Sequence, residues 1–181
     1  ALDANRHVAD SWTVYSVGGG ALREENEPPA DEVYNYKTFA DIVSWAEGQG
    51  RPIWTIVFDN EGEEIRRYLC DVWEQMQQSV RNGLEHEDVL PGGLRLARKA
   101  YSFYKKASAQ RPDLARTGLL SAYSLAVSEE NAGHGIIVTA PTCGSCGIVP
   151  GVLYYLKHHQ NFTDREIINA LATAGLVGNI V

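Results

Sequence analysis

The chain has 181 residues, of which 44% are hydrophobic and 22% charged, and its net charge is −7. The acidic balance disfavours nucleic acid as a partner, because phosphate binding needs a cationic face. No apolar run reaches the roughly 18 residues of a membrane span, and the first residues lack both an initiator Met and the apolar core of a signal peptide. Three cysteines, an odd number, are typical of a reducing compartment. We therefore expect a cytoplasmic protein with no membrane or nucleic-acid partner.

A short β segment opens the chain. "WTVYSV", residues 12–17, is rich in β-branched and aromatic residues and predicts a strand. Gly18, Gly19 and Gly20 end it and indicate a loop whose backbone passes close to another group. The acidic, proline-containing stretch 23–32 then predicts a solvated linker and a domain boundary.

Helical periodicity follows the linker. Residues 37–50 place apolar side chains on one stripe and end in glycines, and residues 62–84 repeat apolar residues at spacings of three and four. Residues 51–61, "RPIWTIVFDNE", contain a short apolar run that fits a buried strand or a buried helix equally well. The acidic residues after that run lack the alternating spacing of a calcium loop.

Four further helices are indicated towards the end of the chain. A Pro-Gly-Gly turn at residues 91–93 leads into a basic amphipathic helix, and a second helix ends near Gly133. Pro150 stands near the start of a third, and Thr163 and Glu166 are spaced as the capping box of a fourth. The chain is therefore predicted to be mainly α, a helical array preceded by a short β segment. Because the last residues, "GLVGNIV", are apolar, we expect the natural domain to continue beyond them.

Cys143 and Cys146 form a Cys-x-x-Cys before a predicted helix, and three interpretations remain open. A thioredoxin-like redox pair needs a surrounding βαβ pattern, which the helical sequence downstream does not supply. A complete structural zinc site needs four ligands, and only Cys70 and scattered histidines remain. The third interpretation is that both are small packing residues at a tight turn.

The residues around the two cysteines favour a binding loop. Gly, Ser and Thr residues that open a helix present free backbone N–H groups at the positive end of the helix dipole, which suits a carboxylate or a phosphate. No Gly-Lys-Ser/Thr follows, so a nucleotide is not indicated. The candidate binding residues of this loop are Thr139, Thr142, Cys143, Gly144, Ser145 and Gly147.

Polar residues just upstream are weaker candidates. Glu129, Glu130 and Asn131 could serve in acid–base chemistry, although a solvated helix end is the plainer interpretation for each glutamate. Acidic residues at that end oppose the helix dipole, so they need another justification. His134 is expected at the surface, and the pair 158–159 is expected to close a helix, where a cation suits the dipole.

Four motifs in order resemble the iron–sulfur-dependent L-serine dehydratases of bacteria. "TAPTCGSCGIVPGVLYY" resembles that family's Thr-Ala-Pro-Thr-Asn-Gly-Ala-(Cys/Ala)-Gly-Ile signature, and "SEENAGHGIIVTAPT" extends the likeness upstream. "VLPGGLRLARKA" and "YSVGGGALREE" are similar to two further stretches of the family. One departure concerns the signature, where Cys143 replaces the usual Asn, and the effect on an amide contact to substrate stays open.

The resemblance implies that this stretch is the middle of a longer enzyme. Residues 1–27 would be the end of a small β domain, part of a preceding α/β domain, together with the linker. Residues 28–181 would be the first half of the helical catalytic domain. The family's cluster-ligating cysteines would come mostly after Val181, and Cys143 and Cys146 are weak candidates for that role. On its own the stretch is therefore expected to be inactive.

The activity implied by the resemblance is β-elimination of L-serine to pyruvate and ammonia, in amino-acid degradation and gluconeogenesis. A [4Fe–4S] cluster would act as the Lewis acid, without pyridoxal phosphate. The loop from Thr139 to Gly147 would bind the substrate carboxylate, Gly18 to Gly20 would approach the same cleft, and Asn131 would add a polar contact. Glu129 and Glu130 are second choices, the general base is not identified, and a homodimer is the expected assembly. The alternatives are a helical metal- or redox-sensing module built on the two cysteines, and a cysteine desulfidase.

Overall fold

The computed structural model describes residues 11–18, 21–24, 33–139 and 142–180. Two strands, β1 (Val14–Gly18) and β2 (Ala21–Glu24), precede the helices, and a short 3-10 turn, η1 (Cys143–Ser145), lies between the fourth and fifth of them. The helices are α1 (Phe39–Gln49), α2 (Trp54–Glu85), α3 (Ala100–Ser108), α4 (Pro112–Ala132), α5 (Ile148–His159) and α6 (Asp164–Gly178). The mainly helical fold with a short β segment is confirmed.

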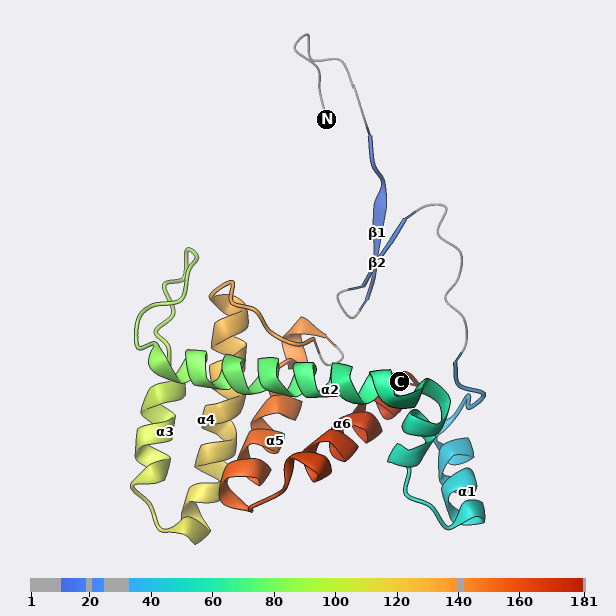
Figure 1. Cartoon of the computed structure of the whole chain (residues 1–181). Coiled ribbons are helices and arrows are strands. Elements are labelled where there is room, and N and C mark those ends of the chain that lie inside the picture. Colours follow the sequence, from blue (N-terminus) through green and yellow to red (C-terminus); the bar gives the residue numbers. More distant parts are fainter. Residues whose placement is uncertain (1–10, 19–20, 25–32, 140–141, 181) are drawn as a thin grey trace.

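The β segment is an antiparallel hairpin. Val14 pairs with Glu24 and Ser16 with Leu22, with an irregularity between Ser16 and Gly18. The predicted strand is therefore confirmed, but the predicted linker begins too early, because Arg23 and Glu24 belong to the second strand. In Figure 1 the hairpin stands away from the helices.

Local signals set the ends of α1. The Thr38 hydroxyl accepts the Asp41 N–H while the Asp41 carboxylate accepts the Thr38 N–H, which forms a capping box. Gly50 closes the helix in the left-handed conformation, with φ of 61°. Gly50 thus ends this helix as the sequence predicts, and Thr38 begins it.

The ambiguous stretch 51–61 is helical and forms the first turns of α2. Ile56 and Val57 are buried there, and Gly62, with φ of 72°, kinks the helix. The apolar face predicted downstream is confirmed, because Leu69, Trp73 and their neighbours at the same spacing lie in the core. None of the described helices is long and apolar enough to cross a lipid bilayer.

Helix α2 runs across α3, α4, α5 and α6 (Figure 1). The basic helix predicted after the Pro-Gly-Gly turn begins only at Ala100, because residues 90–99 form an irregular loop. Gly92, with φ of 112°, and Arg95, with φ of 48°, give that loop its shape. The capping box of Thr163 and Glu166 at the start of α6 is confirmed.

Close helix contacts centre on α4. A Cβ on Gly83 of α2 would lie 2.1 Å from the Ala126 carbonyl oxygen, and one on Gly151 of α5 would lie 2.8 Å from the Ser124 backbone nitrogen. Two apolar clusters fill the interior. The first includes Ile42, Ile56, Trp73, Ile167 and Leu176. The second includes Val80, Leu119, Tyr123, Val127 and Cys146.

Candidate functional site

The motif loop connects α4 to α5. Thr142, Cys143 and Gly144 are exposed, whereas Cys146 and Gly147 are buried at the start of α5. Ala140 and Pro141, which precede them in the signature, lie outside the described residues. The structure therefore places an exposed polar turn directly before a twelve-residue helix.

The turn is held by its own backbone and hydroxyl groups. The Ser145 N–H donates to the Thr142 carbonyl at 3.2 Å, and the Cys146 N–H donates to the Cys143 carbonyl at 3.5 Å. The hydroxyl oxygens of Thr142 and Ser145 lie 3.2 Å apart. The first amides of α5 follow immediately, and by position such amides have no acceptor within their own helix. Backbone donors and two hydroxyls thus gather at one helix N-terminus.

Asn131, at the end of α4, ties this turn to the helix before it. Its Nδ2 donates to the Cys143 carbonyl at 3.2 Å. A Cβ on Gly147 would lie 2.2 Å from the Ser124 carbonyl oxygen, so α5 begins in direct contact with α4. Asn131 therefore belongs with the loop, as a group that positions its backbone.

Two side chains of α2 hold the segment that leads into the loop, and nothing in the sequence pointed to them. The Ser79 hydroxyl and the Gln75 Nε2 both donate to the Ile136 carbonyl, each at 2.9 Å. Ser79 is fully buried. The partner lies 57 to 61 residues away in the sequence, so no local pattern could reveal the contact.

Glu129 and Glu130 are buried, with 6% and 8% exposure, so the interpretation as a solvated helix end is wrong. The Glu129 carboxylate accepts the backbone N–H of Lys99 at 2.6 Å and that of Ala100 at 3.3 Å, and so caps the N-terminus of α3. Glu130 accepts from Asn82 at 3.2 Å. These hydrogen bonds explain why acidic residues stand at the C-terminal end of α4, because each carboxylate bonds to a neighbouring helix.

The candidate residue Thr139 precedes the turn in the chain and lines a cavity. With Val138 it lines an apolar cavity of about 370 Å³ between α2 and α6, whose other walls include Met76 and Leu171. An apolar wall suits a carboxylate poorly, because burying a charge without partners is costly. The structure thus divides the predicted loop into an apolar part at Thr139 and a polar part from Thr142 onwards.

The two cysteines of the loop differ in exposure. Cys143 faces solvent, Cys146 is fully buried, and Cys70 is exposed on α2. Burial, with a smaller contribution from Cys143, raises the pKa of the Cys146 thiol, which favours its protonated form. Within the described residues no group of three or more His, Cys, Asp or Glu side chains could hold a metal ion.

The glycines of the predicted approach loop are described only in part. Gly18 ends β1, while Gly19 and Gly20 lie outside the described residues. His134 is exposed at the surface, as expected, and has a φ of 65°. The approach of this loop to the motif stays a prediction.

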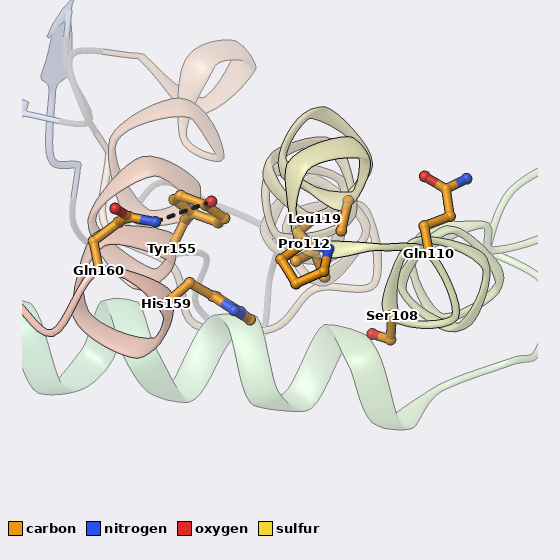
Figure 2. A pocket seen from close by; sticks show the side chains of 8 residues that line it. Ser108, Gln110, Pro112, Leu119, Tyr155, His159 and Gln160 are labelled. Atoms are coloured by element: carbon orange, nitrogen blue, oxygen red, sulfur yellow. Dashed lines mark hydrogen bonds between the residues drawn. The ribbon is translucent and has the colours of Figure 1, made fainter.

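A second cavity, of about 270 Å³, lies at the other end of α5 (Figure 2). Its wall includes Tyr155, whose hydroxyl accepts from Gln160 at 3.3 Å, and His159, whose Nε2 lies 2.7 Å from the Tyr123 hydroxyl. His159 is thus engaged in a contact between α4 and α5. None of the candidate binding residues of the loop from Thr139 to Gly147 lines this cavity.

Comparison with known proteins identifies a family that matches nearly the whole chain. The family described as serine dehydratase alpha chain matches residues 14–181. The L-serine dehydratase of Haemophilus influenzae is 35% identical over 99% of this chain and 43% of its own length. The L-serine dehydratase of Streptomyces coelicolor and L-serine dehydratase 2 of Escherichia coli are each 33% identical over 98% of this chain and 42% of their own length.

The chain thus spans less than half the length of these relatives. The family match nevertheless extends from Val14, the first residue of β1, to residue 181 and includes the whole helical part with its motif loop. On this evidence the chain belongs to the serine dehydratase alpha chain family.

Proposed function

We propose that the intact protein that carries this chain is an L-serine ammonia-lyase. Its relatives bear the name L-serine dehydratase. In this reaction a base removes the α-proton, the β-hydroxyl leaves, and the resulting aminoacrylate gives pyruvate and ammonia. The cytoplasm is its proposed location, as the odd number of cysteines suggests.

The role that we assign to this chain is recognition of the substrate carboxylate by the polar part of the loop. The observation that carries it is the exposed turn of Thr142, Cys143 and Gly144 at the N-terminus of α5. A carboxylate there would accept the Thr142 hydroxyl and the backbone N–H groups of Ile148 and Val149 at the start of α5. Hydrogen bonds to a charged group contribute about 1.5–3 kcal/mol each, and the helix dipole adds to them.

Hydrogen bonds at Cys143 and Ile136 support this role. Asn131 fixes the Cys143 carbonyl, and Ser79 with Gln75 fixes the Ile136 carbonyl. A site whose donors are already in place loses little entropy when the substrate binds, and it holds the α-carbon in a defined position for proton removal. The buried carboxylates Glu129 and Glu130 serve this arrangement indirectly, since they hold neighbouring helices.

The described thiols do not fit a [4Fe–4S] cluster, for which cysteine ligands are the rule. Only Cys143 and Cys146 lie in one turn, and one of them is buried among apolar side chains. We therefore infer that the ligands of any such cluster lie outside the described residues, and we derive no step of the reaction through it.

Two further assignments follow the resemblance. We infer that residues 1–27 close a separate β domain and that the helical domain begins at residue 28. We also infer that the loop at Gly18 to Gly20 reaches the same cleft as the Thr142 turn. The hairpin of β1 and β2 supports the first assignment, because its two strands pair with each other.

The experiment is an anaerobic assay of pyruvate release from L-serine by the intact protein. Replacing Thr142 by Val keeps the shape and removes the hydroxyl, so kcat/KM should fall about 5-fold to 150-fold, the equivalent of about 1–3 kcal/mol. Thr173→Val on α6 is the matched control, because its hydroxyl bonds only its own helix, to the Asn169 carbonyl at 3.0 Å.

The possible results separate the two claims. An intact protein that releases no pyruvate from L-serine contradicts the proposed activity. An active protein in which Thr142→Val behaves like Thr173→Val keeps the activity and removes Thr142 from the substrate site.

A further inference from the structure

The two cysteines of the Cys-x-x-Cys lie within one turn. Cys143 opens η1 and Cys146 follows it directly, and the Cys146 N–H donates to the Cys143 carbonyl at 3.5 Å. In a 3-10 turn the side chains at i and i+3 lie on the same side, about 6 Å apart along the axis at 2.0 Å per residue. Disulfides join Cα atoms that are roughly 4.4–6.8 Å apart. The Cα separation expected for such a turn therefore lies within this range.

The two thiols differ in their exposure to solvent. Cys143 is exposed, whereas Cys146 has an exposed fraction of 0% and belongs to the apolar cluster that contains Tyr123 and Val127. A small oxidant can consequently reach the first thiol and not the second. Burial raises the pKa of Cys146, which favours its protonated form.

We propose that Cys143 and Cys146 form an intrachain disulfide by exchange with a low-molecular-weight disulfide of the glutathione class. The Cys143 thiolate attacks one sulfur of the oxidant, which forms a mixed disulfide and releases the first thiolate. The Cys146 thiol then loses its proton and attacks the Cys143 sulfur, which closes the internal bond and releases a second thiolate. The oxidant is reduced to two thiols and the protein loses two hydrogen atoms.

The bond would lie inside the proposed carboxylate site, and this part of the inference rests on the proposed function. It would link the exposed end of the turn to the buried start of α5, next to the Thr142 hydroxyl and the carbonyl that Asn131 holds. Withdrawing the Cys143 sulfur from the surface changes the wall against which a substrate would lie. We expect oxidation to weaken L-serine binding reversibly, and dithiothreitol to restore it.

The test uses this chain, folded and reduced, treated with oxidised glutathione and then with a maleimide that labels free thiols. Intact mass and peptide mapping are read together. We expect a Cys143–Cys146 cross-link, with the loss of two hydrogens at this pair, and Cys70 as the one cysteine that carries either the label or a glutathione. Cys70→Ser is the matched control, because Cys70 is also exposed but lies on α2. This variant should form the same cross-link and take up no label.

A second variant keeps the test decisive. Cys143→Ser changes an exposed side chain, so the chain should fold as before, which circular dichroism checks, and it should form no internal bond. A stable glutathione adduct on Cys143, or a cross-link that involves Cys70, would overturn the proposal. Because the experiment measures mass, its result does not depend on whether the intact protein acts on L-serine.

Discussion

At the scale of single residues, the contacts of Glu129 indicate a structural rather than a catalytic carboxylate. Its side chain accepts the backbone N–H groups of Lys99 and Ala100 at the N-terminus of α3. Glu129→Ala would leave these donors without their acceptor, at a cost of about 1–3 kcal/mol, and would remove a negative charge from the positive end of the helix dipole.

We therefore predict that Glu129→Ala lowers the melting temperature of this chain by several degrees, measured by circular dichroism, and that Glu129→Gln, which keeps one acceptor oxygen, lowers it less. A normal melting temperature for Glu129→Ala, combined with lost turnover in the intact protein, would instead make Glu129 a substrate contact.

His158 makes stability depend on pH. Desolvation of the part of its ring that packs on Tyr154 lowers its pKa, and the nearby His159, Lys157 and Arg81 lower it further. Below the ordinary value near 6.5, the unfolded chain then binds a proton that the folded chain does not. The free energy of unfolding should consequently fall as the pH drops from 7.5 through 6.5 until the folded pKa is passed.

The corresponding measurement is chemical unfolding of the chain and of His158→Gln at pH 7.5 and pH 5.5. The variant should lose less stability between these two values than the unaltered chain. Equal losses in both would show that His158 does not contribute to the pH dependence.

At the scale of elements, glycine sets the distance between α4 and α5. A Cβ on Gly151 would lie 2.4 Å from the Ser124 hydroxyl oxygen and 2.8 Å from its backbone nitrogen, so Gly151→Ala must push the helices apart. We predict a loss of about 1–3 kcal/mol in the free energy of unfolding.

Gly175 on α6 is the matched control, because a Cβ there meets nothing within 4 Å. Gly175→Ala should stabilise the chain by up to about 1 kcal/mol through helix propensity. Urea unfolding measures the change in the free energy of unfolding for both variants. Equal effects of the two substitutions would contradict the close α4–α5 contact.

The same scale shows what the sequence could and could not reveal. The capping box of Thr163 and Glu166 was predictable because both partners lie within one turn. The helix at Ile56 and Val57 was not predictable, because a strand and a helix bury a short apolar run in the same way. The burial of Glu129 depends on a partner 30 residues away.

The candidate site divides in the same manner. The polar turn at Thr142 was visible as a Gly, Ser and Thr-rich stretch before a helix. The support of its flank by Ser79 and Gln75 was not, because α2 meets this segment only through the tertiary fold. Sequence reasoning thus indicated the exposed turn and Asn131, and it missed the support by Ser79 and Gln75.

At the scale of the whole molecule, the β hairpin and the helices are separate in their packing. Among the described residues, neither apolar cluster includes a member of β1 or β2. We predict that a chain beginning at residue 28 keeps the helical circular dichroism and the melting temperature of the full 181-residue chain. A markedly lower melting temperature would place the domain boundary elsewhere.

The central claim concerns the exposed turn at the start of α5, and the most direct test is a structure of the intact protein with L-serine bound. We predict that the substrate carboxylate lies within about 3 Å of the Thr142 hydroxyl or of a backbone nitrogen of the turn or of the first residues of α5. A carboxylate held elsewhere, more than about one side-chain length from this turn, would contradict the account.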